Sequence, residues 1–267
     1  MSTAQQGQQA NRPLSGRHAL VTGGARGIGE AIARALLDQG ARVTILGRGA
    51  DALAQTAGAL GTWGTISAVR ADVSDADAVA RAFAEARDRS GPIDILINNA
   101  GAAESAPFRK IDAPLWRRMM AVNLDGTFHC IHEALPAMLQ ARWGRIVNVA
   151  STAGLVGYRY VSAYCAAKHG VVGLTRALAL ETATFGITVN AVCPGYTDTA
   201  MTTRTIENIV ARTGAAPAEV LATLTAQNPQ NRLLTPGEVA HAVVRLCVPG
   251  TEAITGQAIA VTGAEAM

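Results

Sequence analysis

The stretch HALVTGGARGIGEAIARALLDQGARVTILGRG, residues 18–49, predicts how the fold begins. Two β-branched runs, HALVT and RVTILG, flank a segment whose apolar residues recur with the period of a helix. Gly23, Gly27 and Gly29 lie between the first run and the helix, where glycine permits a tight turn and close approach of the backbone to a phosphate. The stretch therefore predicts a strand–helix–strand unit that binds a dinucleotide phosphate at the helix N-terminus. For the glycine triplet taken alone, an ordinary turn is the alternative.

The same alternation of strand and helix continues to the end of the chain. Runs such as IDILIN, GRIVNV and ITVNAVCP are apolar on both faces, and each precedes a segment of helical period. Strands of this kind form parallel sheets that helices cover on both sides. We expect an α/β fold over residues 14–267: a single-domain, doubly wound (Rossmann) parallel sheet of about seven strands with helices on both faces. Residues 1–13 are predicted to be a disordered tail.

Capping signals mark the starts of two predicted helices. Before the last helix, Thr235 is followed by Pro236 and by Glu238 three residues later, which is the pattern of an N-cap with a capping box. Ser74 and Asp77 have the same spacing before the helix that follows the third strand, with aspartate in the place of the usual glutamate or glutamine. Both helices are expected to begin at these residues.

The end of the second predicted strand carries a cation where a carboxylate is common. In dinucleotide-binding folds this position contacts the adenosine ribose: an acidic residue accepts from a free 2′-hydroxyl, whereas an arginine accommodates a 2′-phosphate. Here Arg48 follows Gly47, and Arg26 in the glycine turn is a second cation. The pattern predicts NADP(H) as the preferred cofactor, with NAD(H) as the alternative. Two surface arginines without a ligand are the other interpretation.

Composition and charge argue against several classes of function. The formal charge of +3 comes from scattered arginines and not from basic runs, so no nucleic-acid partner is expected. No apolar run reaches the roughly 18 residues of a membrane span, and the first residues lack the pattern of a secretory signal. The cysteines have no paired or metal-ligand spacing, which predicts reduced core residues, no metal site and a cytoplasmic protein. They are Cys130, Cys165, Cys193 and Cys247.

A tyrosine and a lysine share one face of the helix SAYCAAKHGVVGLTRALALE, residues 162–181. Tyr164 and Lys168 are four residues apart, so their side chains lie one above the other. A neighbouring ammonium favours the phenolate and lowers the pKa of a tyrosine toward the range useful for proton transfer at neutral pH. Taken alone, the pair has a purely structural interpretation as well.

Six short motifs together extend this pattern over essentially the whole chain after the tail. They are TGGARGIG at 22–29, NNAG at 98–101, AVNLDG around Asn123, NVAST around Ser151, YCAAK at 164–168 and PGYTDT at 194–199. Their order and spacing, including the thirteen residues from Ser151 to Tyr164, resemble the short-chain dehydrogenase/reductase family.

The resemblance implies a catalytic set of four residues. Tyr164 matches the family's acid/base, which protonates a carbonyl oxygen in reduction or takes the alcohol proton in oxidation. Lys168 would lower the pKa of Tyr164 and bind the nicotinamide ribose, and Ser151 would hold the substrate oxygen. Asn123 would bind a water that links Lys168 to solvent. Asn98, in contrast, is expected to satisfy backbone groups where strands end.

The resemblance also implies the residues that contact the cofactor. Those on the phosphate and adenosine side are Gly23, Arg26, Gly27, Ile28, Gly29, Arg48, Asp72, Val73, Asn99, Ala100 and Gly101. Those on the nicotinamide side are Tyr164, Lys168, Pro194, Gly195, Thr197 and Thr199. The same likeness implies a substrate lid at about 196–232 and a homotetramer formed by the helices at 112–141 and 162–181.

Within this family the sequence resembles 3-oxoacyl-thioester reductases, polyketide ketoreductases and 3-hydroxybutyrate dehydrogenases. The last group holds a free carboxylate with a glutamine after NNAG and a histidine two residues beyond the catalytic serine. This chain has Ala102, Ala103 and Ala153 at those positions, which disfavours a small hydroxy acid. The lid, with Met201 and Ile206, is apolar enough to favour an acyl chain.

We therefore predict an NADP(H)-dependent oxidoreductase that transfers a hydride between nicotinamide and a carbonyl or secondary alcohol. The expected substrate is a 3-oxoacyl or 3-hydroxyacyl thioester. One alternative is a secondary-alcohol dehydrogenase or ketoreductase for cyclic or aromatic ketones. Another is a non-catalytic nucleotide-binding regulator, which would have no need for all four catalytic residues.

Overall fold

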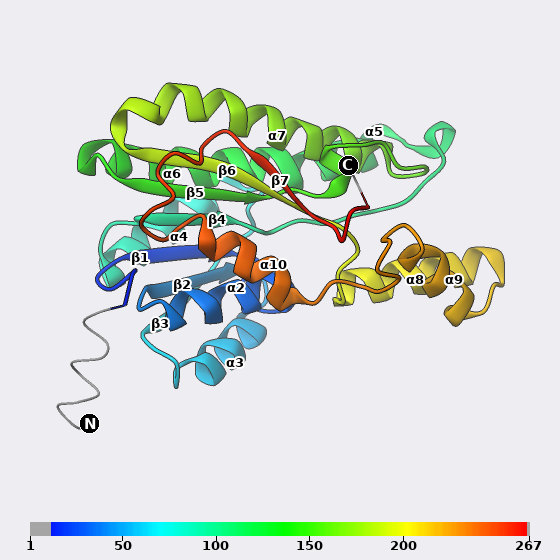
Figure 1. Cartoon of the computed structure of the whole chain (residues 1–267), viewed down its shortest axis with the longest axis horizontal. Coiled ribbons are helices and arrows are strands. Elements are labelled where there is room, and N and C mark those ends of the chain that lie inside the picture. Colours follow the sequence, from blue (N-terminus) through cyan, green and yellow to red (C-terminus); the bar gives the residue numbers. More distant parts are fainter. Residues whose placement is uncertain (1–11, 266–267) are drawn as a thin grey trace.

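The structure, a computed structural model, describes residues 12–265. Within this range seven parallel strands form one sheet in the order β3-β2-β1-β4-β5-β6-β7 (Figure 1). The chain changes direction across the sheet between β1 and β4, so this is the switch point where ligands of doubly wound sheets bind. The predicted doubly wound parallel sheet is confirmed. Its strands are β1 (His18–Thr22), β2 (Arg42–Gly47), β3 (Ile66–Arg70), β4 (Ile95–Asn98), β5 (Gly144–Val149), β6 (Ile187–Pro194) and β7 (Ala258–Val261).

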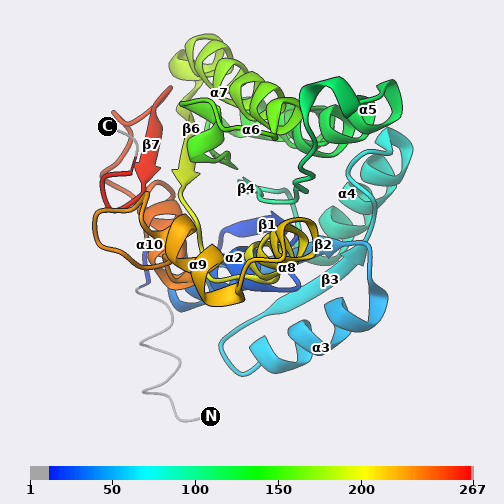
Figure 2. The same ribbon diagram turned by 90° about the vertical axis from the view of Figure 1, so that its right-hand side faces the viewer.

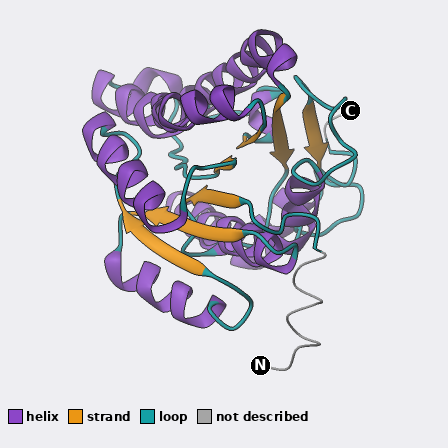
Figure 3. Cartoon of the chain, turned by 90° about the vertical axis from the view of Figure 1, so that its left-hand side faces the viewer, coloured by secondary structure: helices purple, strands orange, loops and turns teal. Residues whose placement is uncertain are grey.

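Helices cover both faces of the sheet (Figures 1 and 3). One layer contains α2 (Gly27–Asp38), α3 (Ala50–Leu60) and α10 (Pro236–Arg245). The other contains α4 (Ala76–Ser90), α6 (Gly126–Ala141) and α7 (Ser162–Thr182). Beside α7 lies α5 (Ala113–Met120), which joins α6 through the π-helical turn η2 (Ala121–Asp125). The short 3-10 helices are η1 (Phe108–Lys110), η3 (Thr152–Gly154) and η4 (Ala183–Phe185).

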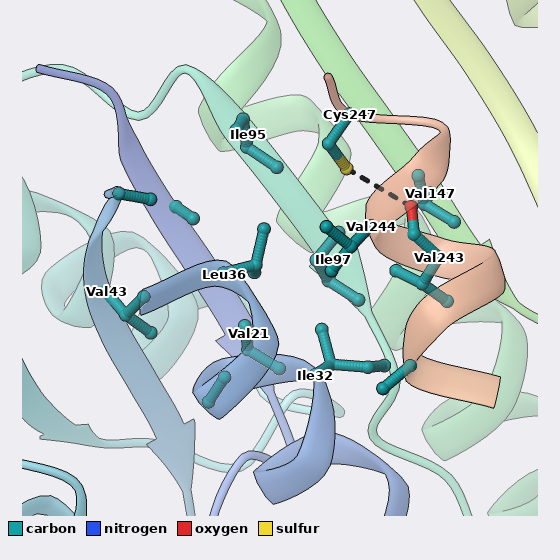
Figure 4. Packing of buried hydrophobic residues seen from close by; sticks show 14 of the residues in the cluster. Val21, Ile32, Leu36, Val43, Ile95, Ile97, Val147, Val243, Val244 and Cys247 are labelled. Carbon is teal, nitrogen blue, oxygen red and sulfur yellow. Dashed lines mark hydrogen bonds between the residues drawn. The ribbon is translucent and has the colours of Figure 1, made fainter. Parts of the chain in front are cut away.

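The core between the sheet and the α2/α10 layer is aliphatic (Figure 4). Val21 of β1 and Ile97 of β4 are fully buried together with Ile32 and Leu36 of α2 and Val243 of α10. Ile32 and Leu36 are four residues apart and therefore share one face of α2. Burying one such side chain contributes about 1.5–3 kcal/mol. This packing holds α2 against β1 and β4, directly behind the glycine turn.

The opposite face of the same strands forms a second core. Leu20 of β1 and Leu96 of β4 alternate with Val21 and Ile97, so their side chains lie on the other side of the sheet. They pack in one cluster with residues of the second helical layer: Phe83 of α4, Ile131 of α6 and Leu178 of α7. Strands that are buried on both faces explain why the sequence shows apolar runs without polar alternation.

One predicted cap is confirmed and the other is wrong. Thr235 is the N-cap of α10 and forms the predicted capping box with Glu238. At α4 the N-cap is Asp75, whose side chain accepts from Ala78 N at 3.0 Å. The Ser74 hydroxyl instead donates to Asp72 Oδ1 at 2.7 Å. The helix therefore begins one residue later than the Ser74–Asp77 pattern predicted.

The structure describes the whole of the predicted lid but only the end of the predicted tail. The lid region contains two helices, α8 (Ala200–Thr213) and α9 (Pro217–Thr225), which follow the carboxyl end of β6 (Figure 2). Most of the predicted tail, residues 1–11, lies outside the described residues. Arg12 is described, and its guanidinium donates to Leu37 O at 3.4 Å. Among the described helices, none is long and apolar enough to cross a membrane.

His18 belongs to a chain of hydrogen bonds at the start of β1. Its Nδ1 lies 2.8 Å from Gly91 O, and its Nε2 lies 2.8 Å from Thr44 Oγ1. Because a carbonyl oxygen only accepts, Nδ1 carries the proton and Nε2 accepts from Thr44. The Thr44 oxygen in turn lies 2.8 Å from Ser67 Oγ. Burial of the ring lowers the pKa of His18 below its ordinary value.

The lowered pKa of His18 predicts a loss of stability on acidification. An unfolded histidine takes up its proton near pH 6.5, whereas folded His18 does so only at lower pH. Between these two values only the unfolded chain gains the proton, so stability present above about pH 6.5 is lost as the pH falls through the folded pKa. His18→Gln should reduce the difference in unfolding free energy between pH 7.5 and 5.5, as measured by urea unfolding. His241→Gln, at an exposed position of α10, is the control; equal pH dependence in wild type and His18→Gln would contradict this account.

Candidate active site

The glycine turn between β1 and α2 is held by close backbone contacts. Gly23 has a φ of +65°, and a β-carbon there would lie 2.9 Å from Asn99 Nδ2. A β-carbon at Gly29 would lie only 2.2 Å from the Gly23 carbonyl oxygen. Gly27, with a φ of +56°, faces Thr199 before α8, whose Cγ2 would be 3.3 Å from an added β-carbon. Shape and backbone conformation therefore both require glycine in this turn.

Two residues tie the glycine turn to the end of β4. Thr22 Oγ1 accepts from Asn99 N at 3.0 Å and from Ala100 N at 2.9 Å. The Asn99 side chain donates to Thr22 O at 2.9 Å and to Gly23 O at 3.2 Å. These four bonds join two predicted cofactor segments, TGGARGIG and NNAG, across the switch point of the sheet.

The N-terminus of α2 fits a pyrophosphate group. Arg26 is its N-cap in extended conformation and provides no side-chain cap. The N–H groups of Gly27, Ile28 and Gly29 belong to the first turn, where they have no partner within the helix. Free N–H groups, the positive end of the helix dipole and the absence of β-carbons make this a site for an anion. The cofactor implied by the sequence therefore matches the residues present.

Two residues predicted to contact the adenosine part of the cofactor, Arg48 and Asp72, form an ion pair with each other. Arg48 Nη1 lies 3.8 Å from Asp72 Oδ2, and both side chains are largely exposed. Burial raises the pKa of Asp72, but hydrogen bonds from Ser74 and the charge of Arg48 outweigh it and hold that pKa below its ordinary value. Arg70 Nε donates to Arg48 O at 2.9 Å, which fixes the backbone at the end of β2. The sequence indicated Arg48 and Asp72 separately and did not predict their ion pair.

Val73, predicted beside Asp72, lies against the start of α6. A β-carbon at Gly126 would lie 2.7 Å from Val73 Cγ2, so the helix approaches this residue closely. His129 of α6 lies with its Nδ1 3.0 Å from Val73 O. The carboxyl end of β3 is thereby anchored to the helix that follows Asn123.

Ser151 and Tyr164 meet beyond the end of β5. Ser151 is the N-cap of η3, and its Oγ accepts from Ala153 N at 3.1 Å. Burial raises the pKa of Tyr164 to about 12, and a hydrogen bond with Ser151 only partly offsets this rise. The structure thus brings Ser151 and Tyr164 together, while their expected action on a substrate oxygen stays a prediction.

Lys168 is buried below Tyr164 but does not bond to it. Its Nζ donates to Val149 O at 2.9 Å and lies 5.7 Å from the centroid of the Tyr164 ring. Burial lowers the pKa of Lys168 to about 8. Burial of the phenol is the largest effect on the pKa of Tyr164, and the expected lowering of that pKa by Lys168 stays a prediction.

Asn123 lies in the π-helical turn between α5 and α6, next to Gly101. Its Nδ2 donates to Ala102 O and Met119 O, both at 2.9 Å, and its Oδ1 accepts from Ala102 N at 3.2 Å. A β-carbon at Gly101 would lie 2.8 Å from Asn123 Oδ1 and 3.6 Å from Lys168 Nζ. The structure thus brings Asn123 beside Lys168, while the predicted water relay remains a prediction. A π-helical turn in a helix often marks a functional site.

The predicted nicotinamide side follows β6. Pro194 ends the strand, and Gly195 N donates to Val261 O of β7 at 3.0 Å. The Thr197 hydroxyl donates to Gly195 O at 3.1 Å, and Thr199 caps α8 by accepting from Thr202 N. These residues form the base of the predicted lid, and Thr199 reaches across to the glycine turn.

Asn98 has a structural role, but its partner is a side chain and not the backbone groups expected. Its Nδ2 donates to Asn148 Oδ1 of β5 at 2.9 Å, and Asn148 Nδ2 donates to Thr175 Oγ1 of α7 at 2.9 Å. All three residues are buried. This chain of hydrogen bonds joins β4, β5 and α7 and fixes the position of α7 on the sheet. Tyr164 and Lys168 belong to the same helix, so their positions are fixed with it.

Sequence reasoning missed several residues of the site. Thr22 directly precedes the glycine motif and could have been noticed from that position. Tyr158, Tyr196 and Glu265 cluster near Ser151 but come from three separate segments, and no local pattern marks them. Arg212 at the end of α8 donates to Ser105 O at 2.9 Å, which attaches α8 to the loop after β4.

Comparison with known proteins agrees with this geometry. Residues 17–210 match the family model of the short chain dehydrogenases. A cis-4-hydroxycyclohexanecarboxylate dehydrogenase of Sinomonas cyclohexanicum is 42% identical, over 92% of this chain and 95% of the relative. An acetoacetyl-CoA reductase of Shinella zoogloeoides is 39% identical, over 93% of this chain and 98% of the relative.

The fold has a close counterpart among solved structures. A crystal structure of a variant of actinorhodin polyketide ketoreductase with NADPH superposes with a TM-score of 0.91. It is 39% identical in sequence, and the match covers 94% of this chain and 97% of that one. The chain therefore belongs to the short-chain dehydrogenase family. It is an oxidoreductase of the class that acts on alcohol and ketone groups.

The crowding around Gly29 predicts that alanine is not tolerated there. A β-carbon would lie 2.2 Å from Gly23 O and 2.5 Å from Asn99 Nδ2, so Gly29→Ala should destabilise the fold by about 2–3 kcal/mol or more and weaken binding of a nicotinamide cofactor. Gly58→Ala is the control, because in α3 an added β-carbon meets nothing within 4 Å and should stabilise the helix by up to about 1 kcal/mol. Urea unfolding measures both effects; equal stability of the two variants contradicts the prediction.

Proposed function

We propose that the protein is an NADP(H)-dependent reductase that interconverts a 3-oxoacyl thioester and the corresponding 3-hydroxyacyl thioester. The observation that carries the proposal is that Ser151, Tyr164 and Lys168 meet beyond the same edge of the sheet as the glycine turn. A carbonyl placed beside Ser151 and Tyr164 would thus lie near a nucleotide held at α2.

The catalytic steps follow from the positions of the side chains. When bound, the nicotinamide group supplies or accepts the hydride at the substrate carbon. Tyr164 donates its proton to the carbonyl oxygen during reduction, and a pKa of about 12 keeps this proton on the phenol at neutral pH. Ser151 accepts from Ala153 N, which leaves its own O–H to donate to the same oxygen. Two donors at one oxygen stabilise the charge that develops there.

Lys168 and Asn123 support this pair. Lys168 has a pKa of about 8, so a substantial fraction carries a proton at neutral pH. Together with Asn123, it lies beside Gly101, which ends the NNAG motif predicted to contact the cofactor. In the proposed cycle Lys168 orients the nicotinamide ribose, and the water expected at Asn123 links Lys168 to solvent.

The preference for a thioester rests on two features of the chain. The positions next to the site that would hold a free carboxylate carry Ala102, Ala103 and Ala153. In α8 only Thr202 is buried, so the apolar side chains Met201 and Ile206 remain partly exposed on the lid. An apolar acyl chain would cover them, at about 0.8 kcal/mol for each buried methylene group. The acetoacetyl-CoA reductase among the relatives supports this choice.

A ketoreductase for cyclic ketones is the second candidate. It is favoured by the relative that acts on cis-4-hydroxycyclohexanecarboxylate, which has the higher identity of the two curated relatives described above. The two candidates share the same chemistry at Ser151 and Tyr164, and they differ only in what the lid covers.

Turnover with a small panel of carbonyl compounds tests the proposed function. With NADPH, the wild type should reduce acetoacetyl-CoA with a kcat/KM well above that for free acetoacetate or a cyclic ketone of similar size. Tyr164→Phe should lower kcat by about 10²–10⁴-fold, because it removes only the proton donor. Cofactor binding, measured by fluorescence titration, should persist in this variant.

Three outcomes would overturn parts of this assignment. If a cyclic ketone is the best substrate and the thioester is not reduced, the second candidate function replaces the first. Retention of more than about a tenth of wild-type kcat in Tyr164→Phe removes Tyr164 from the role of proton donor. Cofactor binding without turnover of any carbonyl compound favours a non-catalytic nucleotide-binding regulator.

The preference for NADPH over NADH is proposed to depend on Arg48, with Arg26 as a second cation. Losing a charge-assisted contact to the 2′-phosphate should raise the KM for NADPH about 10- to 100-fold in Arg48→Ala, while the KM for NADH changes little. Adding Gly47→Asp should shift the preference toward NADH. Arg81→Ala, at an exposed position of α4, is the control. Equal kcat/KM of the wild type for both cofactors contradicts the assignment.

We further propose a symmetric homotetramer. Large apolar side chains remain exposed on the helices expected at the interface: Trp116 of α5 at 38%, Phe128 of α6 at 51% and Leu180 of α7 at 84%. Burying such residues between copies is a common way to form closed oligomers. Light scattering at micromolar concentration should give the mass of a tetramer, and Phe128→Glu should shift it toward smaller species. A monomeric wild type would refute the proposal.

A further inference from the structure

A carboxylate from the C-terminal segment lies next to the proposed substrate site. Glu265 Oε1 accepts from the Tyr158 hydroxyl at 2.5 Å. Its other oxygen lies over the backbone of Gly195, where a β-carbon would come within 2.3 Å of it. Glu265 thus contacts two segments that border the site, the loop after Ser151 and the start of the lid.

The turn that presents Glu265 is held tightly. Thr262 Oγ1 accepts from Ala264 N at 3.2 Å, and Thr262 O accepts from Glu265 N at 3.3 Å. Ala264 has a φ of +78°, a left-handed conformation that costs free energy in a residue other than glycine. Gly263 packs so closely on Asn228 that a β-carbon would lie 2.2 Å from Asn228 Oδ1. Contacts on both sides therefore impose the conformation that directs Glu265 toward Tyr158.

Glu265 is coupled to the catalytic residues through two tyrosines. Tyr158 also bonds to Thr152, which directly follows Ser151 in the chain. Tyr196 interacts electrostatically with Glu265 and with Tyr164. Burial, followed by the hydrogen bond with Glu265, raises the pKa of Tyr158, so its proton stays on the phenol and is donated to the Glu265 carboxylate.

We propose that Glu265, held by Tyr158, is a specificity-determining residue that excludes substrates with a free carboxylate near the reacting carbonyl. Two negative charges brought together in a partly buried site repel each other more strongly than in water. A neutral ester or thioester of the same acid lacks this repulsion. The inference rests on the proposed function and adds a second reason why oxo acids are poor substrates. The site lacks the side chains that would bind a free carboxylate, and Glu265 repels that carboxylate.

A pair of substrates that differ in charge tests this role. Acetoacetate carries the carboxylate, and the N-acetylcysteamine thioester of acetoacetate is its neutral counterpart. The quantity measured is the ratio of kcat/KM for the thioester to kcat/KM for the acid. In the wild type this ratio should favour the thioester, and Glu265→Gln should lower it about tenfold or more, mainly through a lower KM for acetoacetate.

Two further variants separate charge from disturbance of the site. Tyr158→Phe removes the hydrogen bond but keeps the charge of Glu265, so its ratio should stay at the wild-type value or rise. Glu85→Gln removes an exposed carboxylate from α4 and should leave the ratio unchanged. Thermal unfolding of each variant shows whether the fold is retained.

The outcomes distinguish the inference from the proposed function. If the wild type reduces the thioester but Glu265→Gln leaves the ratio within about twofold, or if the wild type prefers acetoacetate, the inference alone is overturned. An equal fall of the ratio in Tyr158→Phe also overturns it, because the charge is still present there. A wild type that reduces neither compound with NADPH contradicts the proposed function and the inference together.

Discussion

The hydrogen bonds that join the end of β1 to the end of β4 are the constraint on which the site depends. Thr22 accepts from two backbone N–H groups beyond β4, and the Asn99 side chain donates to two carbonyls of the glycine turn. They fix the glycine turn at the switch point, where the first turn of α2 faces outward from the sheet. They also place Gly101 against Asn123 and Lys168. The same four hydrogen bonds therefore position both the glycine turn and the segment next to the predicted catalytic residues.

A second set of buried polar contacts positions α7. The chain from Asn98 through Asn148 to Thr175 holds the middle of the helix, and Lys168 bonds to Val149 O nearer its start. Buried polar groups are costly unless they are paired, so a shift of α7 along the sheet would break several bonds at once. This rigidity keeps Tyr164 within reach of Ser151. It also explains why Lys168 is held by the end of β5 and is not turned toward the phenol.

The two ends of the site differ in charge. At the adenosine end, Arg48 lies beside Asp72 on an exposed surface, where a phosphate group can compete for the arginine. At the proposed substrate end, the Glu265 carboxylate is held by Tyr158. In the proposed assignment, Arg48 attracts the anionic cofactor and Glu265 repels a substrate with a free carboxylate. Electrostatics of this kind affects the choice of ligand more than it affects the stability of the fold.

The sequence by itself determined the features that depend on neighbours a few residues apart. The glycine turn, the cap of α10 at Thr235 and the shared face of Tyr164 and Lys168 all follow from local spacing, and the apolar runs indicated a sheet buried on both sides. Only the tertiary structure decided the pKa of Tyr164, the bond from Lys168 to Val149 and the place of Glu265. Those features depend on burial and on partners brought together from distant parts of the chain by the order of the strands. Hydrogen bonding and desolvation act over a few ångströms in space, whatever the separation of the residues along the chain. The spacing of neighbouring residues in the sequence therefore does not predict them.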